Sequence, residues 1–120
     1  MVSRIDNKDG TPKEIFGPDK LGILPVPKNI MDLIREGLRD VTNEGGTAGD
    51  LFKGFPINVA GKTGTAENAH GRDHGWFVAY APYDKPQIVV VALVEQGGFG
   101  AGSAGPIVRD ILSAYFKVPT

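Results

Sequence analysis

The stretch "GWFVAYAPYDKPQIVVVALV" (Gly75–Val94) decides the fold of this chain. Both of its ends are rich in β-branched and aromatic residues, which is typical of strands. The first end, Gly75–Ala81, alternates between its two faces, whereas the second, Ile88–Val94, is apolar throughout and is expected to be buried on both faces. The turn-forming "PYDKP" (82–86) joins the two ends, so the stretch predicts an antiparallel β-hairpin.

The segments before the hairpin predict a further strand and a helix. A strand is expected over Ile57–Glu67, which includes "VAGKTGTAE" (59–67). The segment Pro27–Thr42 instead has apolar residues at steps of three and four, which indicates an amphipathic helix ending near "NEGG" (43–46). The predicted buried side of this helix consists of Ile30, Met31, Ile34, Leu38 and Val41, and its solvated side of Arg35, Glu36, Arg39 and Asp40.

The two ends of the chain complete the predicted architecture. Near the N-terminus, "DNKDGT" (6–11) is a turn signal and predicts a short hairpin. After the central hairpin, "GGFGAG" (97–102) reads as a loop, and Ser103 is expected to cap a helix that runs to Phe116. The expected core stripe of that helix is Ile107, Ile111 and Tyr115, with Val108 and Leu112 beside it. We therefore predict one α+β unit over residues 1–120, with an antiparallel sheet of about three main strands, an N-terminal hairpin and flanking helices.

Composition narrows the classes of function. The chain has 120 residues, 41% of them hydrophobic, and a formal net charge of −1, which gives no electrostatic reason to expect nucleic acid as a partner. There is no cysteine, which excludes disulfides, thiolate catalysis and cysteine-based zinc sites. The longest apolar run, Ile88–Val94, is far shorter than the roughly 20 residues that a transmembrane helix needs.

The tripeptide Gly-Lys-Thr at 61–63 allows two interpretations. A phosphate-binding loop would require a glycine where this chain has Pro56, which offers no N–H to a phosphate. Read instead as a strand, Lys62 and Gly64 lie on one face and Thr63 and Thr65 on the other. The lysine and the two hydroxyls could bind a carboxylate, and the strand backbone could pair with a peptide. The spacing alone also fits an ordinary strand with a surface lysine.

Four stretches in this order resemble the penicillin-binding proteins, the serine D,D-transpeptidases of peptidoglycan synthesis. The stretch "AGKTGTAE" (60–67) is similar to the Lys-Thr/Ser-Gly strand of that family, and "GLRDVTNEGGTA" (37–48) to the helix and turn before it. The stretches "HGWFVAYAPYDKPQIVVVALVEQGG" (74–98) and "AGPIVRDILSAYF" (104–116) resemble the two following strands and the closing helix. The match is best with the class B, elongation-type subgroup, penicillin-binding protein 2. It implies part of a β-lactamase/transpeptidase-like fold.

The resemblance implies acyl transfer from a D-Ala–D-Ala stem peptide through a serine that β-lactams also acylate. Lys62 would lie beside the nucleophile, and the Thr63 and Thr65 hydroxyls would bind the substrate carboxylate next to Gly64. The Thr65 N–H would be one of two oxyanion donors. No cofactor and no metal are implied. The implied location is the bacterial cell envelope, at the extracytoplasmic face of the cytoplasmic membrane.

Two of the three motifs of this family are not found in the sequence. None of Ser3, Ser103 and Ser113 has a lysine three positions on or an asparagine two positions on. We therefore expect the C-terminal part of a transpeptidase domain, without turnover of its own, whose partner is the N-terminal part of the same domain. In the family the strand equivalent to Ile88–Val94 pairs with an N-terminal strand, so that edge could instead support a homodimer.

Other interpretations stay open at this point. The chain could be a non-catalytic peptide-binding or interaction module, or a relative of the serine β-lactamases. His70, Asp73 and His74 could suggest a metal site, but the glycines of "AHGRDHG" (69–75) favour a solvated turn between strands. Trp76, Phe77 and Tyr80 could form a ligand platform, but packing on the sheet is the simpler explanation.

Overall fold

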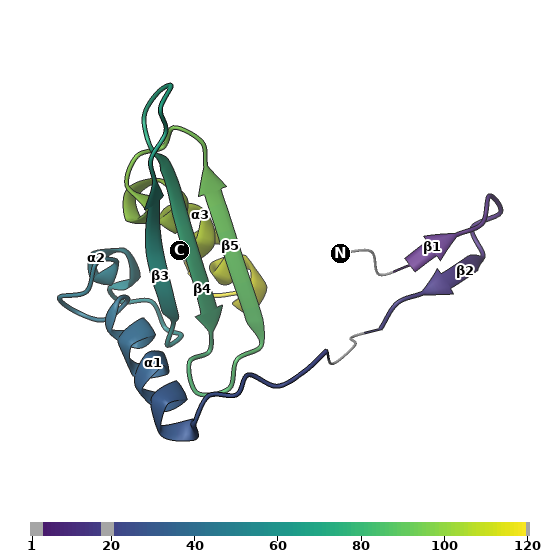
Figure 1. Cartoon of the computed structure of the whole chain (residues 1–120), viewed down its shortest axis with the longest axis horizontal. Coiled ribbons are helices and arrows are strands. Elements are labelled where there is room, and N and C mark those ends of the chain that lie inside the picture. The colour runs from purple at the N-terminus through teal and green to yellow at the C-terminus, as the bar shows by residue number, and fades with distance from the viewer. Residues whose placement is uncertain (1–3, 18–20, 120) are drawn as a thin grey trace.

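The computed structural model describes residues 4–17 and 21–119, so Ser3 lies outside the described residues. The strands β3, β4 and β5 form one antiparallel sheet in that order, and β1 and β2 form a separate hairpin (Figure 1). The α+β prediction is confirmed. In chain order the elements are β1 (Arg4–Asp6), β2 (Pro12–Ile15), α1 (Lys28–Asp40), α2 (Gly49–Phe52), β3 (Ala60–Ala66), β4 (His74–Ala81), β5 (Ile88–Val94) and α3 (Gly100–Phe116).

The core lies between the sheet and α3. Phe77 stands at the centre of β4, opposite Thr63 of β3 and Ala92 of β5, and is 0% exposed. Val108 and Leu112 of α3 are equally buried and belong to the same apolar cluster. The cluster also includes Phe52, which stacks on Phe77 with ring centroids 6.0 Å apart and so ties α2 to the core.

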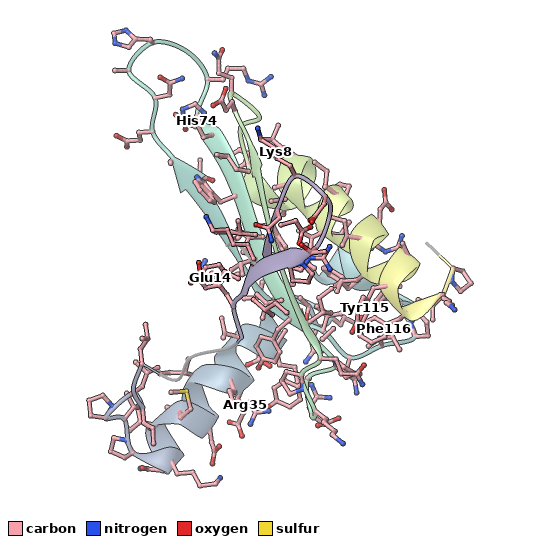
Figure 2. The ribbon with its side chains drawn as sticks, turned by 90° about the vertical axis from the view of Figure 1, so that its right-hand side faces the viewer. Lys8, Glu14, Arg35, His74, Tyr115 and Phe116 are labelled. Carbon is pink, nitrogen blue, oxygen red and sulfur yellow. The ribbon has the colours of Figure 1, made fainter. Side chains whose placement is uncertain are left out.

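The other face of the sheet is open, which corrects the prediction that β5 is buried on both faces. Val89, Val91 and Leu93 of β5 are exposed, and so are Trp76 and Val78 of β4. Figure 2 shows the sheet from its side, with α3 against one face only. The apolar run of β5 therefore indicates a strand with two apolar faces, of which the described chain covers one.

Helix α3 begins earlier and packs through a different stripe than the sequence predicts. Its N-cap is Phe99, and Ser103 is the fourth helical residue, whose hydroxyl donates to the Phe99 carbonyl at 3.0 Å. The cap prediction for Ser103 is therefore wrong, and the predicted loop is helical from Gly100 onward. The stripe that meets the sheet is the smaller set Ala104, Gly105, Val108 and Leu112, while Ile107, Ile111 and Tyr115 remain exposed.

Helix α1 is attached to the sheet by arginines, which corrects the prediction of a solvated polar side. The guanidinium carbons of Arg35 and Arg39 lie 5.3 and 4.9 Å from the ring centroid of Tyr83, in the turn between β4 and β5. Arg35 also donates to the Tyr83 carbonyl at 2.8 Å. The expected apolar stripe is only partly buried: Ile30 and Ile34 are 45% and 49% exposed, whereas Val41 packs against the core cluster. Cation–π contacts to one tyrosine thus add to the apolar packing at the end of this helix.

A tight turn leads from α1 toward β3. The Thr42 hydroxyl, which is buried, donates to the Val59 carbonyl at 2.6 Å and so fastens the end of α1 to the segment before β3. Gly46 and Gly49 pack directly against the backbone of residues 40–44, where any Cβ would overlap. This close turn leads into the one-turn helix α2, which the sequence does not predict. None of the helices in the described ranges is long and apolar enough to cross a membrane.

The N-terminal hairpin stands apart from the sheet. Every described residue of β1 and β2 is exposed, and Figure 1 shows the hairpin away from the sheet. The turn at residues 7–11 is closed by the Asn7 N–H, which donates to the Thr11 carbonyl at 2.8 Å. The predicted hairpin is therefore present, but it adds nothing to the core.

Candidate functional site

The Lys-Thr-Gly stretch lies on a strand with a free edge. Residues 60–66 of β3 pair with β4 on one side, and within the described residues no strand pairs with β3 on the other. Every second backbone N–H and C=O group on that free side is available to an added extended peptide. The sequence predicted this strand to begin at Ile57, but pairing starts only at Ala60.

On the open face of the sheet, Lys62 borders a shallow pocket. Lys62 is exposed, and its ammonium donates to the Thr63 carbonyl at 2.9 Å. The pocket has a volume of about 270 Å³ and lies between the motif and the exposed apolar side chains of β4 and β5. Its lining comprises Lys62, Thr63, Gly64, Trp76, Phe77, Val78 and Val91. A cation at the rim of an apolar surface can hold an anionic group of a ligand that packs there.

On the opposite face, Thr63 and Thr65 point toward the side of the sheet that carries α3. Thr63 is half-buried opposite Phe77, whereas Thr65 is exposed opposite Gly75. Thr65 also lines a second pocket of about 300 Å³, at the C-terminal end of β3. The alternation predicted for Lys62, Thr63, Gly64 and Thr65 is thus present, and the motif strand contributes to both pockets.

Close packing explains two glycines here, Gly64 in the motif and Gly100 at the start of α3. A Cβ on Gly64 would lie 3.1 Å from the Cβ of Trp76, so the glycine makes room for the tryptophan on the neighbouring strand. A Cβ on Gly100, the first residue of α3, would overlap the Trp76 carbonyl oxygen and come within 2.6 Å of the Gly64 carbonyl oxygen. The start of α3 therefore rests directly on the backbone of the motif strand.

The histidines considered as metal ligands lie in and beside the turn between β3 and β4. The His70 N–H donates to the side-chain oxygen of Asn68 at 3.0 Å, and His74 Nδ1 accepts from the Gln96 N–H at 3.0 Å. Residues 4–17 and 21–119 contain no group of three or more His, Asp and Glu side chains arranged to hold a metal ion. His74 thus closes the end of the sheet by bonding the segment after β5.

A further pocket lies away from the motif, and the sequence analysis did not anticipate it. It has a volume of about 300 Å³ and is formed by the turn after α1, by α2 and by the segment that leads to β3. Phe52 and Phe55 line it together with Asn43, Asn58 and the charged residues Glu44, Asp50 and Lys53. Its position depends on α2, for which the Gly-rich sequence carries no helical periodicity.

Comparison with protein families finds one match over most of the chain. Residues 1–113 match the model described as the penicillin binding protein transpeptidase domain. The peptidoglycan D,D-transpeptidase MrdA of Haemophilus influenzae is 36% identical over 99 residues, covering 69% of this chain and 15% of that protein. MrdA of Escherichia coli K12 is 31% identical over 121 residues, covering 88% of this chain and 19% of that protein.

The solved structures give the same result. The crystal structure of Pseudomonas aeruginosa PBP2 in complex with WCK 5153 superposes with a TM-score of 0.72 at 37% identity, covering 89% of this chain and 24% of that one. The chain therefore spans less than a fifth of the length of these two MrdA proteins and about a quarter of the superposed PBP2 chain. The match extends over the sheet and its helices.

Proposed function

This chain belongs to the penicillin-binding protein transpeptidase domain family, and we propose that it forms one side of the substrate site of a peptidoglycan D,D-transpeptidase. The reaction of the whole enzyme would be acyl transfer, in which a serine attacks the D-Ala–D-Ala bond and releases the terminal D-alanine. The amine of a second stem peptide would then take the acyl group. This chain would hold the donor peptide during these steps.

The observation that carries the proposal is the free edge of β3, with the motif at its centre. A donor peptide added antiparallel to this edge would bring its terminal carboxylate toward Lys62, where the Thr63 and Thr65 hydroxyls could also bind it. Gly64 presents no side chain on the strand between them. The Thr65 N–H would donate to the oxyanion that develops on the scissile carbonyl.

The serine and its lysine base would come from the N-terminal part of the same domain. The 120 residues contain neither Ser-x-x-Lys nor Ser-x-Asn. We therefore expect the chain to bind the donor peptide without turning it over and to gain activity only with that N-terminal part. β-Lactams would likewise be held here and acylate a serine outside this chain. The site would face the extracytoplasmic side of the cytoplasmic membrane, in the cell envelope.

A peptide titration followed by ¹⁵N NMR tests this cradle. The probe is acetyl-L-Ala-D-Ala-D-Ala, with its C-terminal amide as the control that lacks the carboxylate. We expect the acid to shift the backbone signals of residues 62–66 and to bind about ten-fold or more tightly than the amide, because a charge-assisted hydrogen bond contributes about 1.5–3 kcal/mol. Equal binding of the acid and the amide would refute the assigned carboxylate site.

A conservative variant sharpens that test. Thr65→Val removes one hydroxyl from an exposed position and should weaken binding of the acid without lowering the stability of the fold. Thr47→Val makes the same change at an exposed turn far along the chain and should leave binding unchanged. Incubation with a fluorescent penicillin should leave no covalent label on the denatured chain. A specific label would identify a nucleophile within these residues and contradict the proposed division of the site.

A second partner is possible at the other edge of the sheet. Within the described residues β5 pairs only with β4, and three of its apolar side chains are exposed. Such an edge recruits a further strand, either the N-terminal strand of the same domain or the β5 of a second copy. We propose a homodimer through Ile88–Val94 for the chain in isolation. Light scattering that gives the monomer mass at millimolar concentration would exclude it.

A further inference from the structure

The pocket beside α2 has no part in the proposed cradle, although its lining is that of a small-molecule site. It has a volume of about 300 Å³ and lies between the turn that follows α1, the one-turn helix α2 and the segment before β3. Small-molecule sites have volumes of about 300–1,000 Å³, a mostly apolar lining and a few polar groups that face the ligand. We term this hollow the α2 pocket and consider its apolar and charged groups in turn.

The apolar part of the lining includes an aromatic corner. Phe52 is buried and Phe55 is half-buried, and their rings meet edge to face with centroids 5.7 Å apart and planes at 80°. Ile57 and Val59 complete this part of the lining. A compact apolar group that enters the α2 pocket therefore finds two aromatic and two aliphatic side chains to pack on, and burial of its apolar surface favours binding.

Hydrogen bonds hold one wall of the α2 pocket in place. The Thr42 hydroxyl joins the end of α1 to the Val59 carbonyl at 2.6 Å. The neighbouring carbonyl, that of Asn58, accepts from the Tyr83 N–H at 2.8 Å, which ties the same segment to the turn between β4 and β5. This wall is therefore formed before a ligand arrives, and a ligand does not bear the cost of ordering it.

The charges around the α2 pocket favour a cation. Glu44 and Asp50 line it, against the single cation Lys53. Neither carboxylate is in an ion pair within residues 4–17 and 21–119. The pocket also lies at the C-terminal end of the 13-residue helix α1, where the helix dipole presents its negative end. The guanidinium carbon of Arg109 lies 5.5 Å from the ring centroid of Phe55, but Arg109 does not line the pocket.

We propose that the α2 pocket binds a small organic cation with a compact apolar body, of the arylalkylammonium class. The apolar body packs on Phe52 and Phe55, and the ammonium group donates to the carboxylates of Glu44 and Asp50. Aromatic rings beside acidic groups form a setting that attracts ammonium ions. The site does not depend on the proposed transpeptidase cradle, with which it shares no residue. Because its lining ends at Val59, next to the first residue of β3, a bound cation would also restrain the start of the motif strand.

Four probes titrated into the ¹⁵N-labelled 120-residue chain separate the charge from the apolar body. They are 2-phenylethylammonium, its uncharged analogue 2-phenylethanol, the anion 3-phenylpropionate, and ethylammonium, which lacks the ring. We expect 2-phenylethylammonium to shift the backbone signals of residues 43–59 and to have a lower Kd than the alcohol, by about two- to five-fold for each carboxylate, as exposed ion pairs do. The anion should bind more weakly than the alcohol. Ethylammonium should bind about ten-fold or more weakly than 2-phenylethylammonium, because it buries no ring.

Two substitutions of exposed side chains assign the charge preference to the α2 pocket. Glu44→Gln and Asp50→Asn should each remove about two- to five-fold of the preference for the cation over the alcohol, and the double variant should remove all of it. Glu95→Gln is the matched control. It makes the same change as Glu44→Gln at an exposed position that follows β5, at the opposite end of the sheet, and should leave the preference unchanged.

The results separate this site from the other surfaces of the chain. Saturable shifts at residues 43–59 with the expected order of affinities support the proposal. Equal affinity for the cation and the alcohol, tighter binding of the anion, or shifts that do not saturate would overturn it. Shifts confined to Trp76 and Val91 would place the ring in the shallow pocket beside Lys62 and would also overturn it. An equal loss of preference in Glu95→Gln would reduce the effect to net charge. None of these results bears on the proposed cradle, which has its own test with the acetylated peptide.

Discussion

Two glycines in the first turn of α3 provide a matched test of how this helix holds the motif strand. A Cβ on Gly100 would overlap the Trp76 carbonyl oxygen, reach its carbonyl carbon at 2.9 Å and lie 2.6 Å from the Gly64 carbonyl oxygen. A Cβ on Gly102 meets nothing within 4 Å. Both positions are helical and two residues apart. Alanine therefore adds the same methyl group to a blocked position and to an open one.

The two substitutions should change the free energy of unfolding in opposite directions. Gly102→Ala should stabilise the chain by up to about 1 kcal/mol, the gain in helix propensity and in reduced unfolded-state entropy. Gly100→Ala makes the same entropic gain, but its methyl group meets backbone atoms, which cannot rotate away as a side chain can. Overpacking costs about 1–3 kcal/mol. The upper end applies here, so we expect a net loss of about 2 kcal/mol.

Urea unfolding followed by circular dichroism at 222 nm measures both variants on the same chain. The expected result is a gap of about 3 kcal/mol between them, with unchanged slopes against urea. In the ¹⁵N NMR spectrum, the Gly100→Ala substitution should also shift the signal of Gly64, whose carbonyl faces the new methyl group. Equal stability of the two variants would show that α3 can move off the strand, and would refute the close contact between the helix start and the motif.

Four further substitutions test contacts of α1 and α3 by the same urea measurement. Thr42→Val removes the buried hydrogen bond to the Val59 carbonyl and should cost about 1–3 kcal/mol, so an unchanged midpoint would contradict that bond. Leu112→Ala should cost about 2–5 kcal/mol, against less than about 1 kcal/mol for Ile111→Ala. A larger loss of stability in Ile111→Ala than in Leu112→Ala would instead support the core stripe that the sequence predicts. Tyr83→Leu removes two cation–π contacts of about 0.5–1 kcal/mol each and should lower the free energy of unfolding by about 1–2 kcal/mol. An unchanged stability would show that these contacts do not attach α1 to that turn.

Strand positions and pairing could be predicted because their signals are local. Alternation in Gly75–Ala81 and the turn residues that follow fix the hairpin of β4 and β5 almost to the residue. The faces of β3 follow from the same period of two, which is why the alternation of Lys62 and Thr63 is present as expected. Pairing of nearby strands needs only local sequence and a short turn.

Which face of each helix is buried could not be predicted, because that depends on the element packed against the helix. Helix α3 has two apolar stripes, and the one with the smaller side chains Ala104 and Gly105 is buried. A Cβ on Gly105 would lie 2.6 Å from Leu51 of α2, so close packing requires a small residue there. In α1 only part of the apolar stripe is covered: Val41 packs against the core, whereas Ile30 and Ile34 remain exposed. The polar side of the helix makes a further contact, between Arg35, Arg39 and Tyr83. A binary pattern indicates which residues can be buried, but not which of two stripes meets a neighbour.

The motif of the proposed site could be read from the sequence, whereas its surroundings could not. The motif can be read from four consecutive positions, whereas the pocket beside Thr65 joins residues 65, 72–73 and 98–99, which only the fold brings together. The sequence contains one indication of this pocket, the glycine at position 98. Gly98 adopts a positive φ, and its close neighbour is Arg72.

The open face of the sheet also supplies an optical reporter. The chain has one tryptophan, Trp76, which is 41% exposed and lines the same shallow pocket as Lys62. All of its indole emission therefore comes from the surface next to the motif, without background from elsewhere. Covering that surface moves the indole from water into an apolar environment and shifts its emission to the blue, whereas strand pairing at the far edge of β5 leaves the ring uncovered. The emission wavelength of Trp76 thus distinguishes a partner that covers the open face of the sheet from one that pairs with the edge of β5, and the measurement needs no added label.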